Sequence, residues 1–387
     1  MLALFGSHGP RHLTTNSKVV FGVRVALVGA GIIGCAVAYE MSKRGAEVHV
    51  YDRGGVGGGA TSAAAGVLCP FLSAEYNVLT KLGAASLAMY DDFVGRVQED
   101  ADSIIEYARD GTLQVSFGAA ATEDLDVARV RHDLNGVKCE VLRAADVLRE
   151  EPQLNPAVSA GLLIPAHGVV SPLSLTSALR IAATRWNALF RENEPVRDLK
   201  SIPAGIRVVT AVSERDYDAA VICAGAWSTL VAVDSATSTG VRPIRGQLLE
   251  FSRSPAAARR PIFLGGEYLI PQIEGRLLVG ATTEDVGYDE QTTTAGLEAL
   301  QKVARSIFPH LYGAQPSGIR VGLRPLLPDR LPAVGESARA RRLFYATGHY
   351  RNGVLLAPLT ARILSGLILD DQRTSLLESI DPRRIGI

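Results

Sequence analysis

The sequence predicts an α/β protein that begins with a nucleotide-binding β-α-β unit, and three observations support this prediction. The motif GAGIIG at 29–34 has the spacing G-x-G-x-x-G. It follows a continuous apolar run at 23–28, typical of a buried parallel strand, and precedes a segment whose apolar residues recur every four positions. Asp52 ends a second short strand, 18 residues after Gly34. A strand, a helix, a strand and an acid in this register describe a Rossmann-like unit.

The three glycines of the motif have separate physical roles. Gly29 makes the tight turn, Gly31 lets the backbone approach a pyrophosphate, and Gly34 lets the helix pack closely on the strand. The amino end of the helix would face the phosphates, and the Asp52 carboxylate would accept hydrogen bonds from both ribose hydroxyls. This pattern alone does not separate FAD from NAD. The glycine- and alanine-rich loop at 54–66 and the lack of a second fingerprint both favour FAD.

The rest of the chain mixes strand and helix patterns. We expect strands at 158–165, 205–212 and 217–223, and a hairpin at 267–282 whose turn is at 273–276. Helical spacing predicts helices at 82–97, 101–109, 297–308 and 354–370. Pro358 should kink the last of these helices.

Composition excludes several classes of protein. A chain of 387 residues suits two domains, and its 40 basic and 40 acidic side chains give no net field toward nucleic acid or an anionic membrane. The four cysteines form no C-x-x-C pair, so we expect no metal site, no disulfide framework and a cytoplasmic location. Residues 1–20 should be a disordered tail. No apolar run reaches the length of a membrane span, so a small-molecule partner is expected.

Four stretches carry a resemblance to a known family. They are TSAAAGV at 61–67, YDAAVICAGAWS at 217–228, VGLRPLLPDRLP at 321–332 and GHYRNGVLLAP at 348–358. With the nucleotide motif, they resemble the glycine oxidase branch of the D-amino-acid oxidase family of flavoproteins, the branch associated with thiamine biosynthesis. The resemblance extends from about residue 23 to about residue 370.

The resemblance implies a two-domain architecture. A Rossmann-like FAD-binding domain would comprise 21–76, 152–240 and 322–387. A mixed-sheet substrate-binding domain, covering the flavin ring, would comprise 77–151 and 241–321. Flavin attachment through a C-terminal cysteine is excluded because the last cysteine is Cys223, so FAD would be bound non-covalently.

The resemblance also implies which residues contact FAD. The first β-α-β unit would hold the adenine half, the following loop would pass under the pyrophosphate and flavin, and a later loop would line the pyrimidine end of the flavin. In this sequence the positions are Gly29, Gly31, Ile32, Ile33, Gly34, Asp52, Arg53, Ala60, Thr61, Ala65, Gly66, Val67, Val196, His349, Tyr350, Arg351, Asn352, Gly353, Val354 and Leu355.

Substrate contacts follow from the same resemblance. Arg324 would pair with a substrate carboxylate, Tyr268 would hydrogen-bond it or close over it, and Arg351 would lie at the edge of flavin and substrate. Thr283 stands at a position near the pocket where family members differ, which leaves substrate size open. A planar guanidinium that grips a carboxylate in two places fixes which substrate hydrogen points at the flavin. From the residues alone, Arg324 and Tyr268 also suit a surface loop and an ordinary strand aromatic.

No catalytic side chain is expected. Hydride transfer from the α-carbon to flavin needs no base, and His349 should touch flavin through its backbone. The implied activity is oxidation of glycine or of a small or N-substituted glycine, with dioxygen as the second substrate and hydrogen peroxide as product. The imine is hydrolysed, to glyoxylate when the substrate is glycine, or passed on.

Three alternatives remain open: an oxidase for a larger N-substituted glycine, a D-amino-acid dehydrogenase that reduces a membrane quinone, and a catalytically silent nucleotide-binding subunit. We expect a homo-oligomer.

Overall fold

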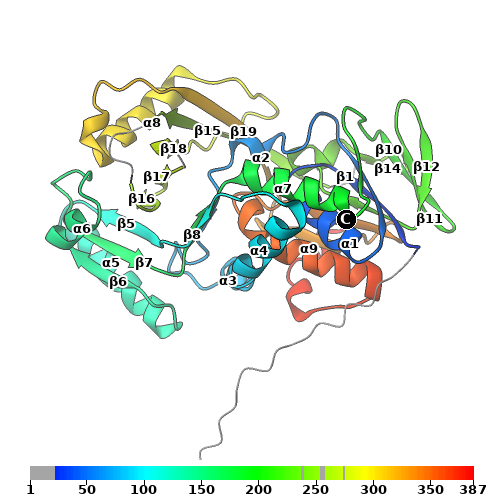
Figure 1. Cartoon of the computed structure of the whole chain (residues 1–387), viewed down its shortest axis with the longest axis horizontal. Coiled ribbons are helices and arrows are strands. Elements are labelled where there is room, and N and C mark those ends of the chain that lie inside the picture. The colour runs from blue at the N-terminus through cyan, green and yellow to red at the C-terminus, as the bar shows by residue number, and fades with distance from the viewer. Residues whose placement is uncertain (1–21, 237–238, 253–257, 273–274) are drawn as a thin grey trace, which may run out of the picture.

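The computed structural model describes residues 22–236, 239–252, 258–272 and 275–387. The predicted tail at 1–20 and part of the predicted hairpin turn, 273–274, lie outside the described residues. Figure 1 shows two lobes, one around α1 and α9 and the other around α8 and β5–β7. Each lobe is built on a large sheet.

The first sheet has six strands in the order β20-β21-β13-β1-β2-β9. Five run parallel, and β20 pairs antiparallel with β21. Their bounds are β1 Arg24–Val28, β2 Glu47–Tyr51, β9 Leu189–Arg191, β13 Ala219–Ile222, β20 Ala333–Glu336 and β21 Leu343–Thr347. Parallel strands with helices on their faces are the Rossmann-like arrangement that the glycine motif predicts, so this part of the fold prediction is confirmed.

The second sheet has eight strands in the order β19-β15-β18-β17-β16-β5-β7-β6. It is mixed, because β16 pairs parallel with β5 while its other pairs are antiparallel. Its bounds are β5 Thr112–Ser116, β6 Glu140–Arg143, β7 Ala160–Ile164, β15 Arg242–Phe251, β16 Ile262–Leu264, β17 Glu267–Pro271, β18 Leu277–Gly280 and β19 Gly318–Leu326. The segment 152–240 therefore contributes to both large sheets, through β7 here and through β9 and β13 in the first.

Two smaller sheets complete the β-structure. One comprises β10 Asp198–Ile202, β11 Gly205–Val209, β12 Glu214–Tyr217 and β14 Ala232–Val233. The other comprises β3 Val67–Leu68, β4 Tyr107–Ala108 and β8 Gly168–Val170. The helices besides those described below are α2 Ala60–Ala63, α5 Ala119–Leu134, α6 Ala144–Glu150 and α8 Thr294–Ile307, with short 3₁₀ turns at Gly225–Leu230, Pro309–Leu311, Ser375–Leu377 and Pro382–Ile385.

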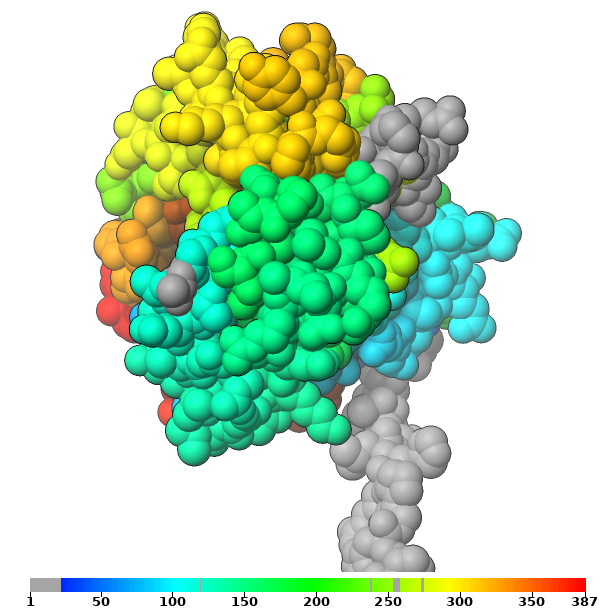
Figure 2. Space-filling view, turned by 90° about the vertical axis from the view of Figure 1, so that its left-hand side faces the viewer, coloured from blue at the N-terminus to red at the C-terminus, as the bar shows by residue number. Residues whose placement is uncertain are grey.

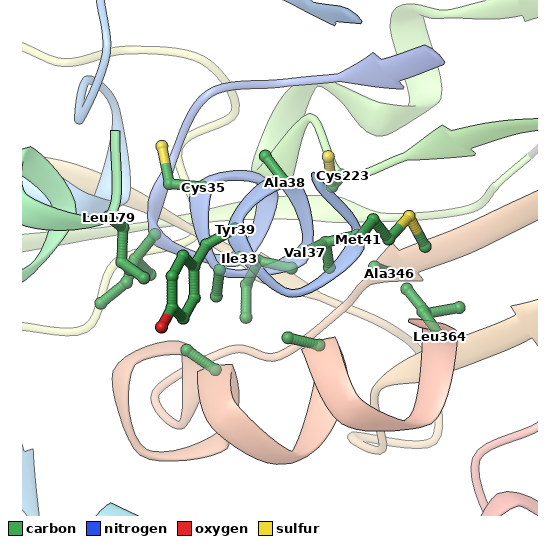
Figure 3. Close-up of a cluster of buried hydrophobic side chains, with 14 of the residues drawn as sticks. Ile33, Cys35, Val37, Ala38, Tyr39, Met41, Leu179, Cys223, Ala346 and Leu364 are labelled. Atoms are coloured by element: carbon green, nitrogen blue, oxygen red, sulfur yellow. The ribbon is translucent and has the colours of Figure 1, made fainter. Parts of the chain in front are cut away.

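Helix α1 (Ile32–Lys43) lies at the centre of the larger core. Side chains from α7 (Pro172–Arg185), β21 and α9 (Gly353–Asp370) gather around it, as Leu179, Ala346 and Leu364 do in Figure 3. A Cβ on Gly34 would overlap the Gly29 carbonyl oxygen. Glycine at position 34 therefore permits the close approach of helix and strand.

Helix α9 continues through Pro358, which removes one main-chain donor from its first turns. The Tyr90 hydroxyl, at the start of α4 (Tyr90–Ala101), donates to the carbonyl of Val354 that Pro358 cannot reach. The Ser86 hydroxyl of α3 (Val78–Leu87) donates to the next carbonyl, Leu355, at 2.6 Å. Helices α3 and α4 thus satisfy the buried carbonyls at the amino end of α9.

The expectation that no apolar run reaches the length of a membrane span is wrong. Helix α9 has 18 residues and a mean hydropathy of 1.5, which is long and apolar enough by composition. However, 78% of that window is buried inside the protein, against α1 and the six-stranded sheet. Its composition is therefore that of a core helix.

Two predicted helices also differ from the structure. The segment 82–97 is two helices, α3 and α4, because the chain turns at Ala88 and Met89. The predicted helix at 101–109 is absent: Asp102 adopts a left-handed conformation (φ 49°) that ends α4, and Tyr107 then pairs with Val170 as part of β4. A long-range strand pairing overrides the local helical spacing here.

Candidate active site

A cavity of about 940 Å³ lies where the two large sheets meet. The residues that follow the carboxyl ends of β1, β2 and β13 form one part of its wall, including Gly29, Asp52 and Cys223. Side chains of the eight-stranded sheet, Tyr268 and Arg324 among them, form another part. Ligands of open α/β sheets bind outside the carboxyl ends of the strands, where this cavity lies.

Nearly all the sequence-predicted site residues line this cavity. They are Gly29, Gly31, Ile32, Ile33, Asp52, Arg53, Ala60, Thr61, Ala65, Gly66, Val67, Val196, Tyr268, Arg324, His349, Tyr350, Arg351, Asn352, Gly353, Val354 and Leu355. The two that do not line it are Gly34, which packs on Gly29, and Thr283, which contacts Arg351. The structure thus brings these residues together, while the individual roles assigned to them stay predictions.

Asp52 is fixed by main-chain amides at one end of the cavity. Its Oδ2 accepts from the Ala30 amide at 2.7 Å, and its Oδ1 accepts from the Gly54 amide at 2.8 Å. Each carboxylate oxygen retains a further lone pair for a ligand hydroxyl. Beside it, the Ile32 amide at the start of α1 donates to the Thr61 hydroxyl at 3.1 Å, which holds the loop against the helix terminus.

Two glycines of the loop after β2 lie very close to the main chain of Val170 and to the ring of Trp227. A Cβ on Gly66 would overlap the Val170 carbonyl, and a Cβ on Gly59 would stand 2.8 Å from the Trp227 ring. Both glycines have positive φ, 58° at Gly59 and 77° at Gly66, a region that other residues rarely adopt. The loop therefore presents bare main chain to the cavity.

The amino end of α9 forms the opposite end of the cavity. No side chain caps this helix, so its first amides are left to the cavity, at the positive end of the helix dipole. His349, just before it, is buried, and its Nε2 pairs with the Thr360 hydroxyl at 3.0 Å. Burial lowers the pKa of His349 to about 4, so the imidazole is neutral near pH 7.

These features fit a flavin dinucleotide. The cavity is long enough to touch both helix termini, offers bare backbone between them, and has a carboxylate at its nucleotide end. The residues around Asp52 and the start of α1 would hold the adenosine and pyrophosphate, and the start of α9 would face the pyrimidine edge of the ring.

Arg324 and Tyr268 lie over glycines of the eight-stranded sheet. A Cβ on Gly246 would overlap the Arg324 guanidinium, and one on Gly280 would stand 2.5 Å from the Tyr268 ring. Burial lowers the pKa of the Arg324 guanidinium and raises that of the Tyr268 phenol. The phenol therefore stays protonated near pH 7, and the guanidinium, whose ordinary value is far above 7, stays charged.

Arg324 and Arg351, the two arginines at this end of the cavity, have no carboxylate partner within the described ranges of the chain. Arg324 Nη1 donates to the Thr282 carbonyl at 3.0 Å, and Arg351 Nη2 donates to the Thr283 hydroxyl at 2.6 Å. Elsewhere arginines such as Arg245 and Arg320 are paired with carboxylates. Two guanidinium groups with only neutral partners make this end of the cavity suited to an anion.

Several residues of the cavity were missed from the sequence. Gly246 gives Arg324 its place, and an isolated glycine inside a strand is a signal that could have found it. Trp227 lies under Arg53, whose guanidinium carbon is 3.6 Å from the ring centroid. Phe263 packs near Tyr268, with ring centroids 5.9 Å apart. The contact between Arg53 and Trp227 joins segments far apart in the chain, so no local pattern marks it. Phe263 and Tyr268 face each other across the β16–β17 hairpin, so a hairpin pattern is the signal that could have indicated their contact.

Comparison with known proteins identifies the family of the chain. A model of the family described as DAO, FAD dependent oxidoreductase, matches residues 24–367. The glycine oxidase of Geobacillus kaustophilus is 31% identical over 349 residues, covering 89% of this chain and 92% of that protein. The bifunctional protein ThiO/ThiG of Synechocystis sp. is 30% identical over 370 residues, 93% of this chain and 54% of that protein.

Solved structures give the same result. The crystal structure of glycine oxidase from Bacillus cereus superposes with a TM-score of 0.86 at 27% identity, covering 93% of this chain and 98% of that one. The family model covers most of the chain, and the cavity fits the dinucleotide. The chain therefore belongs to the DAO family of FAD-dependent oxidoreductases, and its cofactor is FAD.

Proposed function

We propose that the protein oxidises the C–N bond of glycine, or of a small or N-substituted glycine, with dioxygen as the electron acceptor. The similarity to glycine oxidases supports the substrate class. The observation that carries the proposal is the Arg324 guanidinium: it faces the cavity beside Tyr268, and no carboxylate pairs with it in the described parts of the chain. A substrate carboxylate would supply the missing charge.

In this proposal, the cavity side chains bind the substrate and orient it toward the flavin. Arg324 keeps N–H donors free after its bond to Thr282, enough to hold both oxygens of a carboxylate. The protonated Tyr268 hydroxyl would donate to the same carboxylate. Arg351 would lie at the edge of flavin and substrate. A carboxylate held at two points fixes the rotation of the substrate and the hydrogen that points at the ring.

No side chain of the cavity is proposed as a general base. His349 is neutral but buried, with its Nε2 occupied by Thr360. When bound, FAD supplies the oxidation itself, by accepting a hydride from the α-carbon and passing its electrons to dioxygen as hydrogen peroxide. The imine product is hydrolysed, to glyoxylate and ammonia from glycine, or passed to a further enzyme. The similarity to ThiO/ThiG supports a role in thiamine biosynthesis.

The domain division is part of the proposal. Residues 21–76, 152–240 and 322–387 would bind FAD, and residues 77–151 and 241–321 would bind the substrate. Within 152–240, strand β7 lies in the eight-stranded sheet, so the border there would run after residue 164.

Peroxide release from the purified holoprotein tests the activity. The substrates are glycine, sarcosine and short D-amino acids, with the corresponding amines that lack a carboxylate as controls. We expect peroxide only with the carboxylate-bearing compounds. A flavin-loaded protein that releases no peroxide with any of them contradicts the proposal.

A larger N-substituted glycine is the second candidate. Thr283 does not line the cavity, and Gly265 and Gly266, which do, add no side chains to its wall next to Tyr268. This leaves space for a substituent on the amine. Peroxide assays with N-alkylglycines of increasing size separate the candidates: kcat/KM that peaks at glycine favours the first, and one that rises with chain length favours the second.

Location and assembly are also proposed. Four free cysteines and a buried α9 support a cytoplasmic protein.

A homo-oligomer is supported by exposed apolar side chains of α5, which are Val127, Val130 and Leu134 at 52%, 47% and 81% exposure. The segment around α5 and α6, green in Figure 2, forms much of one end of the molecule. Light scattering of the purified protein measures the oligomeric state.

A further inference from the structure

The segment 282–284 runs between the two guanidinium groups of the cavity. The carbonyl of Thr282 accepts from Arg324 at 3.0 Å, and the hydroxyl of Thr283 accepts from Arg351 at 2.6 Å. Since two successive residues contact the two groups, the conformation of this short segment sets the place of both.

Thr282 itself is held in one orientation. Its amide donates to the Gln247 carbonyl at 3.2 Å, and its hydroxyl accepts from the Gln247 amide at 2.9 Å. The same hydroxyl donates to Glu284 Oε1 at 2.6 Å. With its amide and hydroxyl fixed, the peptide of Thr282 has little freedom to rotate, and its carbonyl is aimed at Arg324.

Glu284 is the anchor of this arrangement. Besides Thr282, its carboxylate accepts from Gln247 Nε2 at 2.7 Å and from Arg245 Nη2 at 2.5 Å. Gln247 is fully buried and Arg245 is 2% exposed. The main chains of Arg245 and Glu284 also exchange two hydrogen bonds, at 2.9 and 3.0 Å. Glu284 is partly buried and its partners Arg245 and Gln247 are buried, and charge-assisted bonds in such surroundings are strong and directional, so Glu284 ties the segment to the middle of β15.

We propose that Glu284 is a positioning residue for carboxylate binding: through Thr282 it holds the Arg324 guanidinium in the orientation that receives the substrate. This inference rests on the proposed function, in which Arg324 binds the substrate carboxylate. Glu284 does not line the cavity, so it would not contact a substrate bound there. Its effect therefore passes through Arg324.

The test compares Glu284→Gln with Glu250→Gln in the holoenzyme. Glu250 is a matched control: it lies on the same sheet, pairs with Arg320 of the strand that carries Arg324, and has 18% side-chain exposure against 23% for Glu284. Acetate, a carboxylate without an amine, is the probe, and its Kd is read from the flavin absorbance. The Kd of FAD and the thermal midpoint are measured alongside.

We expect Glu284→Gln to raise the acetate Kd and the glycine KM by about five- to twentyfold, the effect of misplacing one hydrogen-bonded contact. The kcat at saturating glycine should change by less than about threefold, because the bound substrate still meets the flavin. Glu250→Gln should leave both constants near the wild-type values. Equal effects of the two variants, or a loss confined to thermal stability, would overturn the proposal.

A second pair of variants keeps the test independent of Glu284. Thr282→Val removes the hydroxyl that links the segment to Glu284 and Gln247, while Thr282→Ser retains it. We expect weaker acetate binding in the valine variant and near-normal binding in the serine variant. Near-normal acetate binding in the valine variant would show that the hydroxyl is not required, and would contradict the proposal.

The Arg324→Ala background separates this inference from the proposed function. If Glu284 acts through Arg324, adding Glu284→Gln to Arg324→Ala weakens acetate binding no further. Additive losses refute the inference. If Arg324→Ala alone leaves acetate binding unchanged, the proposed carboxylate site fails. If Arg324→Ala weakens binding and Glu284→Gln does not, only the positioning role fails.

Discussion

Removing the Arg324 guanidinium should cost the protein most of its affinity for carboxylates. In Arg324→Ala, a bound carboxylate would lose two charge-assisted hydrogen bonds of about 1.5–3 kcal/mol each. Arg324 is half-buried, and the neighbouring charge of Arg351 remains. We therefore expect the total loss for the two bonds to lie in the lower half of their summed range, at about 3–4 kcal/mol. This corresponds to a Kd increased by about a hundred- to a thousandfold.

The assay is titration of the flavin-loaded variant with acetate and with glycine under anaerobic conditions. Arg320→Ala is the matched control, since Arg320 lies on the same strand but pairs with Glu250 at 2.6 Å. FAD affinity should survive in both variants. Arg324→Lys keeps the charge without the planar fork and should recover only part of the affinity. Near-normal acetate affinity in Arg324→Ala would refute the carboxylate assignment.

Four other changes probe the cavity. Tyr268→Phe removes one hydroxyl donor and should raise the acetate Kd about tenfold, read by the same titration. Gly246→Ala places a methyl group where the Arg324 guanidinium lies, so acetate affinity should fall while circular dichroism stays unchanged. Burial lowers the pKa of His349 to about 4 from 6.5, so on acidification this imidazole is protonated at a higher pH in the unfolded chain than in the folded protein. The free energy of unfolding should therefore fall as the pH drops from 6.5 toward 4, by about 3 kcal/mol in full, and urea unfolding of wild type and His349→Asn should differ in this slope. FAD binding should quench the fluorescence of Trp227, which lines the cavity, and Trp227→Phe should lose most of that quenching.

The nucleotide end of the site could be predicted from sequence because its residues are near one another in the chain. The turn at Gly29, the helix after it and the acid at Asp52 all lie within one β-α-β unit, and each has a local pattern. The wrong helix prediction at 101–109 has a cause that local patterns do not contain. At 101–109 the helical spacing was real, but Asp102 ends the helix and Tyr107 joins a strand pair with Val170. Val170 lies too far along the chain from Tyr107 for a short stretch of sequence to contain both.

The surroundings of Arg324 could not be predicted from local patterns. The register of β15 against β19 places Ile244 opposite Arg324 and Gly246 opposite Gly322, pairs that are 80 and 76 residues apart. Which strand positions face each other is decided by the whole sheet. The resemblance pointed to Arg324 and Tyr268, but the supporting bonds of Glu284 depend on its pairing with Arg245 of β15, 39 residues earlier in the chain, and became visible only in the structure.

The cavity walls have a consequence for the order in which the protein can mature during synthesis. Residues 29–67, 223–231 and 322–355 all contribute to the cavity, and β1 pairs with β13 nearly two hundred residues later. A chain that has emerged from the ribosome only as far as residue 320 has the glycine turn but lacks β21 and α9, which close the far end. FAD should therefore be captured late, after almost the entire polypeptide has been made. Until then the apolar face of α1 that packs against α9 stays uncovered.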